Sequence, residues 1–378
     1  MQELSGILTS EAGGLLVRGN NVRVLDAFGG RLSGKACCVY MDPPYRNGDS
    51  YSHYRDEATH EEWISYMASL LPRVWDVVAD EGSVWISIDD EEMAYLKVLC
   101  DVHFGRSSYV ATIVWQHRTT RENRAAFSHN HEYLLVYAKN PDLFKRTRNK
   151  IAAPDLADRY KNPDDDPRGP WQSITATAQA GHAVPTQFYP VISPTTGKRN
   201  MPPKGRCWVY AEDRMNEEIA AGNIWFGSDG NGVPRIKRFL RDKMPEVVPN
   251  TLWTADEVGT TMSAKKQLLK MFPDDKDEVF ETPKPEGLLA RIIGISTNPG
   301  DIVLDPFLGS GTTAAVAQKM GRRYLGIDRS EKSFEVARSR LDAVIAGDQS
   351  GISADVCWKG GGFYQTATLV DDQVLLSA

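Results

Sequence analysis

Several features that mark well-known classes of protein are missing from this sequence. No stretch reaches the roughly 18 apolar residues that a membrane-spanning helix needs, and the first residues have neither a basic flank nor an apolar signal core. The five cysteines are odd in number and form no CxxC pair, so neither a disulfide framework nor a zinc ribbon is indicated. We therefore expect a cytoplasmic protein with no membrane partner and no bound metal.

Other absences restrict the ligands and partners. The chain has no Gly-Lys-Ser/Thr sequence, so a P-loop for a nucleoside triphosphate is not predicted. A formal net charge of -6 argues against a protein that coats nucleic acid. With 378 residues, 41% of them hydrophobic, the chain can bury a large core, either in one domain with an insertion or in two domains.

Basic residues are nevertheless concentrated in two segments. Residues 115–150 include eight Lys or Arg against three Asp or Glu, and residues 234–243 add five more basic side chains. Basic residues interleaved with aromatic ones suit contacts with phosphate groups, although a solvated charged surface has the same composition. The candidate phosphate-binding residues are Arg118, Arg121, Arg124, Lys237, Arg238 and Arg241.

Strand-like and helix-like segments alternate at both ends of the chain. Expected strands cover 36–41, 83–88, 109–115, 133–138, 301–305 and 323–328, and expected helices cover 59–80, 91–102, 285–295, 312–320 and 331–346. Thr59 and Glu62 have the spacing of a capping box for the first helix. Such alternation predicts an α/β protein with a largely parallel sheet covered by helices.

The middle of the chain has a different character. Residues 141–278 are rich in Pro, Gly, Asp and Trp and show little sustained periodicity, which indicates an inserted module. We therefore divide the chain into 1–140, an inserted module at 141–278, a third segment at 279–348 and a C-terminal extension at 349–378.

A glycine-rich turn follows the strand at 301–305. Ligands of open α/β sheets lie at the carboxyl ends of the strands, where glycines permit close approach and a helix start offers free N–H groups. Asp328 closes the next strand, near the ~20 residue offset at which a carboxylate binds ribose hydroxyls. A purely structural turn is the alternative, and Asp328 favours a cofactor site. Its candidate residues are Asp305, Pro306, Phe307, Gly309, Ser310, Gly311, Thr312 and Asp328.

Three motifs together carry a family resemblance. The sequence DPPY (42–45) resembles the catalytic motif of amino-methyltransferases that modify adenine N6 or cytosine N4, and DPFLGSGTT (305–313) resembles their S-adenosylmethionine motif. FETPKPEGLL (280–289) resembles the further cofactor motif, and the order of the three is that of the β group of DNA methyltransferases. The stretches 82–99, 109–115, 162–171 and 360–363 are similar to modification subunits of Type III restriction-modification systems.

This resemblance implies a Rossmann-like S-adenosylmethionine-dependent methyltransferase fold with an inserted target-recognition module. The segments 1–140 and 279–348 would be its catalytic and cofactor-binding halves, and the basic residues would contact DNA. It adds further candidate residues to the site. They are Asp42, Pro43, Pro44 and Tyr45 for catalysis, and Thr282, Pro283 and Lys284 for the cofactor.

Catalytic roles follow from the chemistry of the amino group. The Asp42 carboxylate and the Pro43 carbonyl would each accept one N–H of an exocyclic amino group, and Tyr45 would stack on the base. The base would have to be flipped out of double-stranded DNA. The implied function is methylation of adenine N6, because DPPY is more typical of adenine enzymes.

Two alternatives remain open, namely methylation of cytosine N4 and a catalytically silent DNA-binding subunit of a larger assembly. Type III modification subunits are usually longer than this chain, which leaves the target sequence, a homodimer and a restriction subunit undecided.

Two other features have structural alternatives. The sequence His129-Asn130-His131 spells HNH, but nuclease motifs of that name extend over a longer unit. Trp115 ends an expected strand, where it either belongs to the core or walls the flipped base.

Overall fold

The computed structural model describes residues 13–46, 58–123, 126–242, 245–273, 280 and 282–376. It contains two compact units, a large unit formed by 1–149 with 249–378 and a small unit formed by 150–248. The small unit is shorter than the inserted module expected at 141–278, because 141–149 and 249–278 belong to the large unit.

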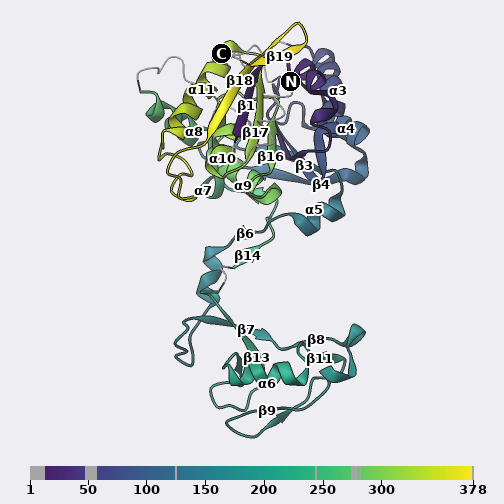
Figure 1. Cartoon of the computed structure of the whole chain (residues 1–378), viewed down its shortest axis with the longest axis vertical. Helices are drawn as coiled ribbons and strands as arrows, with labels where there is room; N and C mark the ends of the chain where they lie inside the picture. The colour runs from purple at the N-terminus through teal and green to yellow at the C-terminus, as the bar shows by residue number, and fades with distance from the viewer. Residues whose placement is uncertain are drawn as a thin grey trace. The chain divides into compact units, whose positions relative to one another are not determined.

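A ten-stranded sheet forms the centre of the large unit (Figure 1). Most neighbouring strands are parallel, but β5 is antiparallel to both of its neighbours and β19 is antiparallel to β18. This arrangement confirms the largely parallel sheet. Across the sheet the strands are β15 (Leu252–Trp253), β4 (Tyr109–Trp115), β5 (Glu132–Ala138), β3 (Val78–Ile88), β2 (Ala36–Met41), β16 (Ile302–Asp305), β17 (Arg323–Asp328), β1 (Gly13–Arg18), β18 (Phe363–Val370) and β19 (Gln373–Leu376).

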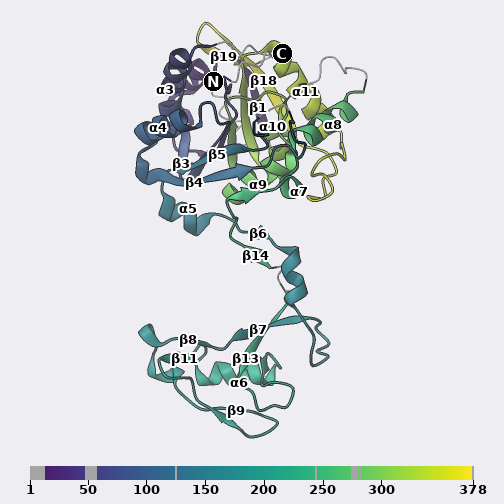
Figure 2. The same ribbon diagram turned by 180° about the vertical axis from the view of Figure 1, so that it is seen from behind.

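Helices cover both faces of this sheet. Their bounds are α2 (Asn21–Phe28), α3 (His60–Val77), α4 (Met93–Phe104), α5 (Pro141–Thr147), α7 (Ala255–Val258), α8 (Thr261–Met271), α9 (Glu286–Ser296), α10 (Thr312–Lys319) and α11 (Glu331–Ile345). Figures 1 and 2 show α3 and α4 on one side of the sheet and α10 and α11 on the other. Among the described residues no helix is long and apolar enough to cross a membrane.

Helix α3 shows how the local sequence determines these elements. Thr59 accepts a hydrogen bond from the Glu62 backbone N–H at 3.2 Å, and the Glu62 carboxylate accepts one from the Thr59 N–H at 2.9 Å, which confirms the capping box. The helix buries one apolar stripe against the sheet and ends at Val77. The expected end at residue 80 was wrong, because the backbone turns extended at Val78 and starts β3 there.

The C-terminal segment also belongs to the large sheet. Strand β18 pairs in parallel with β1, and β19 returns antiparallel to β18. Ala367 and Val374 on these strands are buried in the same core as β1 and α2. The segment after residue 348 therefore extends the sheet by two strands.

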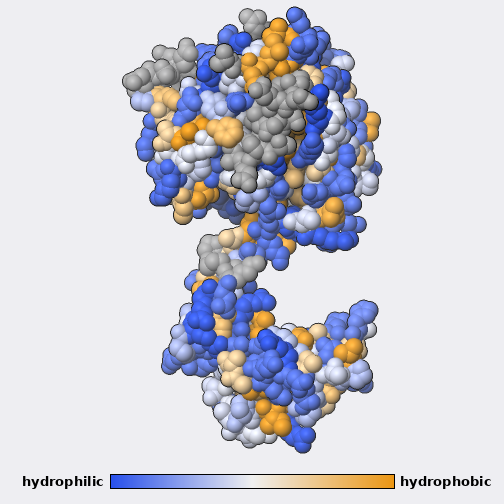
Figure 3. All heavy atoms as spheres, in the orientation of Figure 1, coloured by the Kyte–Doolittle hydropathy of each residue, from blue (hydrophilic) through white to orange (hydrophobic). Residues whose placement is uncertain are grey.

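The small unit is built from short antiparallel pairings around its own core. Trp208 and Met215 are fully buried there. In Figure 3 hydrophilic residues cover much of the visible face of this unit. Its elements are β6 (Ile151–Ala152), β7 (Trp171–Thr175), β8 (Thr177–Gln179), β9 (Val191–Ile192), β10 (Arg199–Asn200), β11 (Arg206–Trp208), α6 (Glu212–Ala220), β12 (Ile224–Trp225), β13 (Arg235–Phe239) and β14 (Glu246–Val247).

Candidate active site

One pocket of about 1730 Å³ opens at the carboxyl ends of the parallel strands in the large unit. Four neighbouring strands of the sheet bring an acidic residue to this edge, with Asp42 after β2, Asp89 after β3, Asp305 on β16 and Asp328 on β17. Strand β5 runs in the opposite direction, so its first residue, Glu132, meets the same edge. Parallel sheets concentrate ligand-binding side chains at this position.

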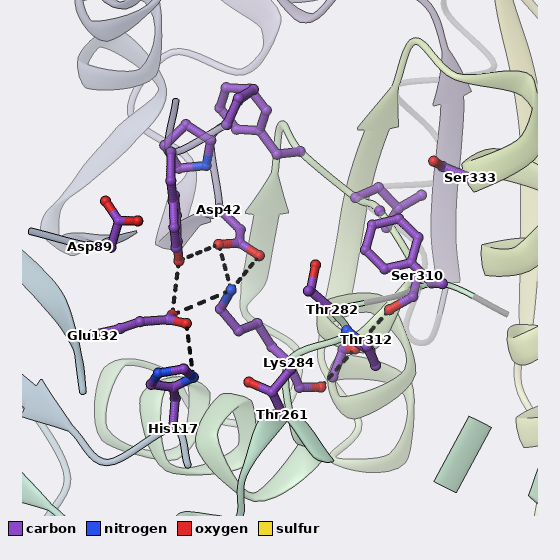
Figure 4. A pocket seen from close by; sticks show the side chains of 18 of the residues that line it. Asp42, Asp89, His117, Glu132, Thr261, Thr282, Lys284, Ser310, Thr312 and Ser333 are labelled. Carbon is purple, nitrogen blue, oxygen red and sulfur yellow. Dashed lines mark hydrogen bonds and ion pairs between the residues drawn. The ribbon is translucent and has the colours of Figure 1, made fainter. Parts of the chain in front are cut away.

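Asp42 lies in a cluster of charged and polar side chains (Figure 4). The Lys284 ammonium is 2.8 Å from Asp42 Oδ1 and 2.9 Å from Oδ2, and 3.6 Å from Glu132 Oε2. The Tyr45 hydroxyl oxygen is 2.8 Å from Asp42 Oδ1 and 3.0 Å from Glu132 Oε2. The structure thus places Lys284, which the resemblance assigned to the cofactor, directly beside Asp42 of the DPPY motif.

Burial and opposite charge act against each other in this cluster. Burial raises the pKa of Asp42, and the Lys284 ammonium only partly offsets this effect. Burial disfavours the charged form of Lys284 as well, but the adjacent Asp42 and Glu132 outweigh it and raise the pKa of this amine. Lys284 is therefore a fixed positive charge beside the candidate catalytic carboxylate.

The prolines of the motif form part of the pocket wall. Pro43 and Pro44 both line it, next to Tyr45. The Trp63 indole N–H donates to the Pro44 carbonyl at 2.7 Å, which fastens the DPPY turn to α3. A turn with two fixed φ angles and an external anchor presents its acceptors rigidly.

The glycine-rich turn lies across the pocket from the DPPY motif. Gly309 has φ +52° and Gly311 has φ +75°, conformations that residues with a Cβ rarely adopt. A Cβ at Gly309 would lie 3.2 Å from the ring of Phe280, and one at Gly311 would lie 2.9 Å from the Ala337 backbone. Both positions require glycine, the first next to the pocket and the second against α11.

Asp328 is held by the turn that it faces. Its carboxylate accepts hydrogen bonds from the Gly309 N–H and the Ser330 N–H, each at 2.8 Å. Burial raises the pKa of Asp328 to about 6 and that of Asp305 to about 7. The Asp305 carboxylate accepts from the Phe307 N–H at 2.8 Å and so shapes the start of the turn.

The segment 282–284 and the start of α10 are directly joined. The Thr312 hydroxyl donates to the Lys284 carbonyl at 3.1 Å and lies 3.3 Å from the Ser310 hydroxyl. Pocket-lining residues of these two segments include Thr282, Pro283, Lys284, Pro306, Phe307, Ser310 and Thr312. The expected cofactor residues thus surround one cavity, with Gly311 behind it.

A buried ion cluster stabilises this junction. Glu286, next to Pro285 at the start of α9, pairs with Lys319 at 2.9 Å and with Arg340 at 3.0 Å. All three side chains are at most 1% exposed. Arg340 also donates to the Thr312 hydroxyl at 2.8 Å, so the cluster connects α9, α10 and α11 behind the glycine-rich turn.

Three pocket residues did not emerge from the sequence. Asp89, Glu132 and His117 line the pocket with the DPPY motif. Burial raises the pKa of Asp89 to about 6. The acidic position directly after the expected strand 83–88 was a usable signal for Asp89, whereas nothing in the sequence showed that the start of β5 would meet this edge.

The six basic residues have different surroundings. Arg118 lines the pocket and Arg121 is exposed, whereas Arg124 lies outside the described residues. In the small unit Arg238 and Arg241 are exposed.

Lys237 differs from the other basic residues of the small unit. Its side chain is 6% exposed and pairs with Asp164 and with Asp166, the latter at 2.8 Å. A lysine neutralised by two aspartates, of which Asp166 is buried, holds its unit together, and we remove it from the candidate phosphate-binding residues.

The contacts of Trp115 and of the sequence His129-Asn130-His131 show their structural roles. Trp115 is fully buried and its indole donates to the Gly259 carbonyl at 3.1 Å, so it belongs to the core. The Asn130 amide donates to the Arg118 and Thr120 carbonyls and fixes the loop after β4. His129 and His131 line the pocket just before β5.

The sheet order and the position of the pocket define the fold class. Strand β5 is inserted antiparallel between β3 and β4, and the glycine-rich turn follows β16 at the centre of the sheet. This is the Rossmann-like fold of S-adenosylmethionine-dependent methyltransferases, with the catalytic strand β2 preceding the cofactor strand β16 in the chain.

The family is identified by comparison with known proteins. A model of the N6/N4 methyltransferases, described as DNA methylase, matches residues 37–339. This match covers most of the chain and includes the DPPY motif, the small unit and the glycine-rich turn. The chain belongs to this DNA methylase family.

Curated relatives agree with that assignment. The Mod subunit of the type III restriction-modification enzyme StyLTI from Salmonella typhimurium is 29% identical over 79% of this chain and 49% of its own length. The type II methyltransferase M.KpnI of Klebsiella pneumoniae is 29% identical over 74% of this chain and 70% of its own length. The chain spans about half the length of the type III relatives it matches.

Solved structures of similar proteins show weaker likeness. TTHA0409 from Thermus thermophilus, solved with S-adenosyl-L-methionine, is 16% identical with a TM-score of 0.43, covering 86% of this chain and 94% of its own. The cytosine-N4-specific PvuII DNA methyltransferase is 11% identical with a TM-score of 0.48, covering 94% of this chain and 95% of its own.

Proposed function

We propose that this protein transfers a methyl group from S-adenosylmethionine to the exocyclic N6 amino group of adenine in double-stranded DNA. The observation that carries the proposal is that Asp42 and Pro43 share one pocket with the glycine-rich turn and Asp328. Membership of a DNA methylase family supports the reaction class, and the DPPY motif favours adenine over cytosine.

Asp42 and Pro43 would make the amino group reactive. Its nitrogen is a poor nucleophile because the lone pair is delocalised into the base. Hydrogen bonds from the two N–H groups to the Asp42 carboxylate and the Pro43 carbonyl would aim that lone pair at the methyl group. Lys284 binds both oxygens of Asp42 at 2.8 and 2.9 Å and fixes the carboxylate for this role.

Tyr45 would hold the flipped base by stacking. Its hydroxyl oxygen is within 3.0 Å of both Asp42 and Glu132, so the ring plane is fixed before the base arrives. Stacking of a base on an aromatic side chain contributes about 1 to 3 kcal/mol. The fixed ring also reduces the entropy that binding has to remove.

The residues of the pocket fit S-adenosylmethionine. When bound, the cofactor supplies a methyl group that is already activated by a sulfonium. Gly309 leaves space that a Cβ would fill against Phe280, and the Asp328 carboxylate lies at the end of β17 to accept hydroxyl groups. The pocket of about 1730 Å³ exceeds the roughly 300 to 1,000 Å³ of most small-molecule sites, which leaves room for a cofactor and a base.

The small unit would read the target sequence and hold the DNA backbone. Arg238 and Arg241 are exposed on this unit, and Arg118 and Arg121 are the corresponding candidates in the large unit. The relative StyLTI Mod is a subunit of a restriction-modification enzyme. A restriction subunit and a second copy of this chain are therefore the partners to test.

Methyl transfer to DNA tests the proposal directly. Purified protein is incubated with labelled S-adenosylmethionine and double-stranded DNA, and the digested nucleosides are analysed by mass spectrometry. We expect N6-methyladenine in the wild type and none with Asp42→Ala, while Asp76→Ala, an exposed aspartate outside the pocket, keeps full activity. N4-methylcytosine would move the assignment to the cytosine alternative, and DNA binding without methylation would support the silent subunit.

A further inference from the structure

A continuous row of polar groups runs from Asp42 to the rim of the pocket. The Tyr45 hydroxyl oxygen lies 2.8 Å from Asp42 Oδ1 and 3.0 Å from Glu132 Oε2, and Glu132 Oε1 lies 3.5 Å from Nδ1 of His117. In Figure 4 a dashed line connects Glu132 to His117, and other dashed lines link Glu132 to Asp42 through the groups between them. His117 lies in the loop after β4, and its side chain is 21% exposed, so the row reaches solvent at its far end.

The geometry suits a proton that is shared between two carboxylates. A phenol has one hydrogen and can donate it to one acceptor at a time. With both carboxylates ionised, Tyr45 donates to one of them. Once Asp42 has taken up a proton, it can donate to the phenol oxygen while Tyr45 donates to Glu132, so both short distances become hydrogen bonds. Asp42 and Glu132 are then the two ends of one proton-transfer unit.

Methylation of an amino group creates the need for such a unit. The nitrogen gains a bond to carbon and must lose a hydrogen, and the nearest acceptor on the proposed path is Asp42. A base and a cofactor in the pocket would cover this carboxylate from the pocket side. The row through Tyr45 then offers the proton a path through the protein.

We propose that Tyr45, Glu132 and His117 carry this proton away from Asp42, an inference that rests on the proposed function. As the carbon–nitrogen bond forms and the carbon–sulfur bond breaks, an N–H bond breaks and its proton passes to Asp42 Oδ1. Asp42 then gives a proton to the Tyr45 oxygen while Tyr45 gives its own to Glu132. Glu132 passes it to Nδ1 of His117, which releases a proton from Nε2 to solvent.

The charged surroundings are compatible with this direction. Burial raises the pKa of Tyr45 well above its usual value, so the phenol relays a proton without becoming a phenolate. Burial lowers the pKa of His117. Lys284 and Arg118 lower it as well, and the opposing effect of Glu132 is smaller than that of burial. The imidazole is therefore neutral at pH 7 and can accept a proton. Lys284 also faces both carboxylates, and the charge of Glu132 contributes to the raised pKa of Asp89 at the end of β3.

The first test separates the hydroxyl of Tyr45 from its ring. Tyr45→Phe keeps the stacking surface, and Glu132→Gln keeps the size of the side chain without its basic oxygen. We expect both to slow single-turnover methyl transfer at least tenfold, within the roughly 10²- to 10⁴-fold range of acid–base groups, with unchanged affinity for DNA and cofactor. Tyr133→Phe is the matched control, because its hydroxyl donates to Asp90 at 2.8 Å outside the row.

A second test distinguishes proton transfer from a structural role. His117→Ala is expected to be slow and to recover at least severalfold when imidazole is added, in proportion to the neutral form of imidazole. Wild-type rates in Tyr45→Phe and Glu132→Gln, or a slow His117→Ala that imidazole does not rescue, would overturn the relay. An inactive wild-type protein would instead refute the proposed function itself.

Discussion

Lys284 binds both carboxylate oxygens of Asp42 although the two residues are 242 positions apart in the chain. The backbone carbonyl of the same lysine accepts a hydrogen bond from the Thr312 hydroxyl at the start of α10. One residue therefore joins the candidate catalytic carboxylate to the candidate cofactor turn. Strands β2 and β16 are distant in the chain and adjacent in the sheet, so the permuted order of motifs still brings these residues together.

The charge of Lys284 controls when Asp42 is ionised. Burial raises the pKa of Asp42 and Lys284 opposes that rise. Replacing the ammonium in Lys284→Met should therefore raise this pKa further, so the acid limb of the rate profile moves to higher pH. We expect methyl transfer near pH 7 to fall by at least tenfold and to recover partly in alkaline buffer. The measurement is the single-turnover rate from pH 5 to 9, with Lys139→Met as a control.

The control has a clear physical basis. Lys139 is a part-buried lysine of the large unit that donates to the Trp75 carbonyl at 2.6 Å and does not line the pocket. Its loss removes a part-buried charge and a hydrogen bond but leaves Asp42 unaffected. A profile in Lys284→Met that keeps the wild-type acid limb would contradict the role assigned to this lysine.

Cofactor binding should depend on Asp328 and on the space beside Gly309. Asp328→Ala removes the carboxylate that is aligned by the Gly309 and Ser330 N–H groups, and Gly309→Val forces a Cβ against Phe280 at a φ of +52°. Both variants should lose binding of S-adenosylmethionine in calorimetry while keeping their circular dichroism spectra. Unchanged affinity in both would remove the cofactor from this pocket.

The ionisation of Asp328 adds a pH dependence to cofactor binding. Burial raises the pKa of this carboxyl to about 6, and the ionised form is the better acceptor for hydroxyl groups. Affinity for S-adenosylmethionine should therefore weaken as the pH falls through about 6. Asp328→Asn, which has no titratable group, should bind weakly and without this dependence.

The buried ion cluster predicts a large effect on stability. Glu286→Gln leaves the charges of Lys319 and Arg340 without their carboxylate at positions no more than 1% exposed. Breaking a buried pair in this way costs about 3 to 5 kcal/mol in the free energy of unfolding. Urea denaturation measures this loss, and Glu335→Gln, which removes an exposed pair with Arg338, should cost less than about 1 kcal/mol.

The sign of the pH effect follows from the shifted pKa of Glu286. Burial works against its charge, but Arg340 and Lys319 outweigh burial and lower this pKa below its usual value. The stabilisation is therefore present above the ordinary glutamate pKa of ~4.3 and is lost as the pH falls through the lower folded value. Glu286→Gln should lack this acid-dependent loss.

The sequence predicted those site residues that follow a recognisable strand or form a contiguous motif. Asp42, Asp305 and Asp328 end parallel strands, where ligand sites occur, and short motifs surround the first two. Glu132 escaped prediction because it begins a strand, and a residue at a strand start reaches the same edge only when the strand is antiparallel. Strand direction depends on long-range pairing, in this case of β5 with β3 and β4.

Composition also did not distinguish exposed basic side chains from a basic side chain that is held in a buried ion pair. Lys237 and Arg238 are neighbours on β13, but successive side chains of a strand point to opposite faces. Lys237 pairs with Asp164 and Asp166, which lie more than 70 positions earlier in the chain, and Arg238 is exposed. No local pattern reveals that pairing.

Exposed basic residues on β13 and just after it are the candidate DNA contacts of the small unit. Arg238 and Arg241 are exposed, so replacing both with Gln should weaken DNA binding and reduce the slope of log K against log salt by about 0.9 for each phosphate that is no longer neutralised. Lys237→Met removes the same charge from a buried pair, so it should lower the melting temperature without that change in slope. Fluorescence anisotropy over a range of about 50 to 200 mM salt measures both slopes. An unaltered slope in the double variant would place the DNA surface elsewhere, because exposed charges that bind phosphate must release counterions when DNA binds.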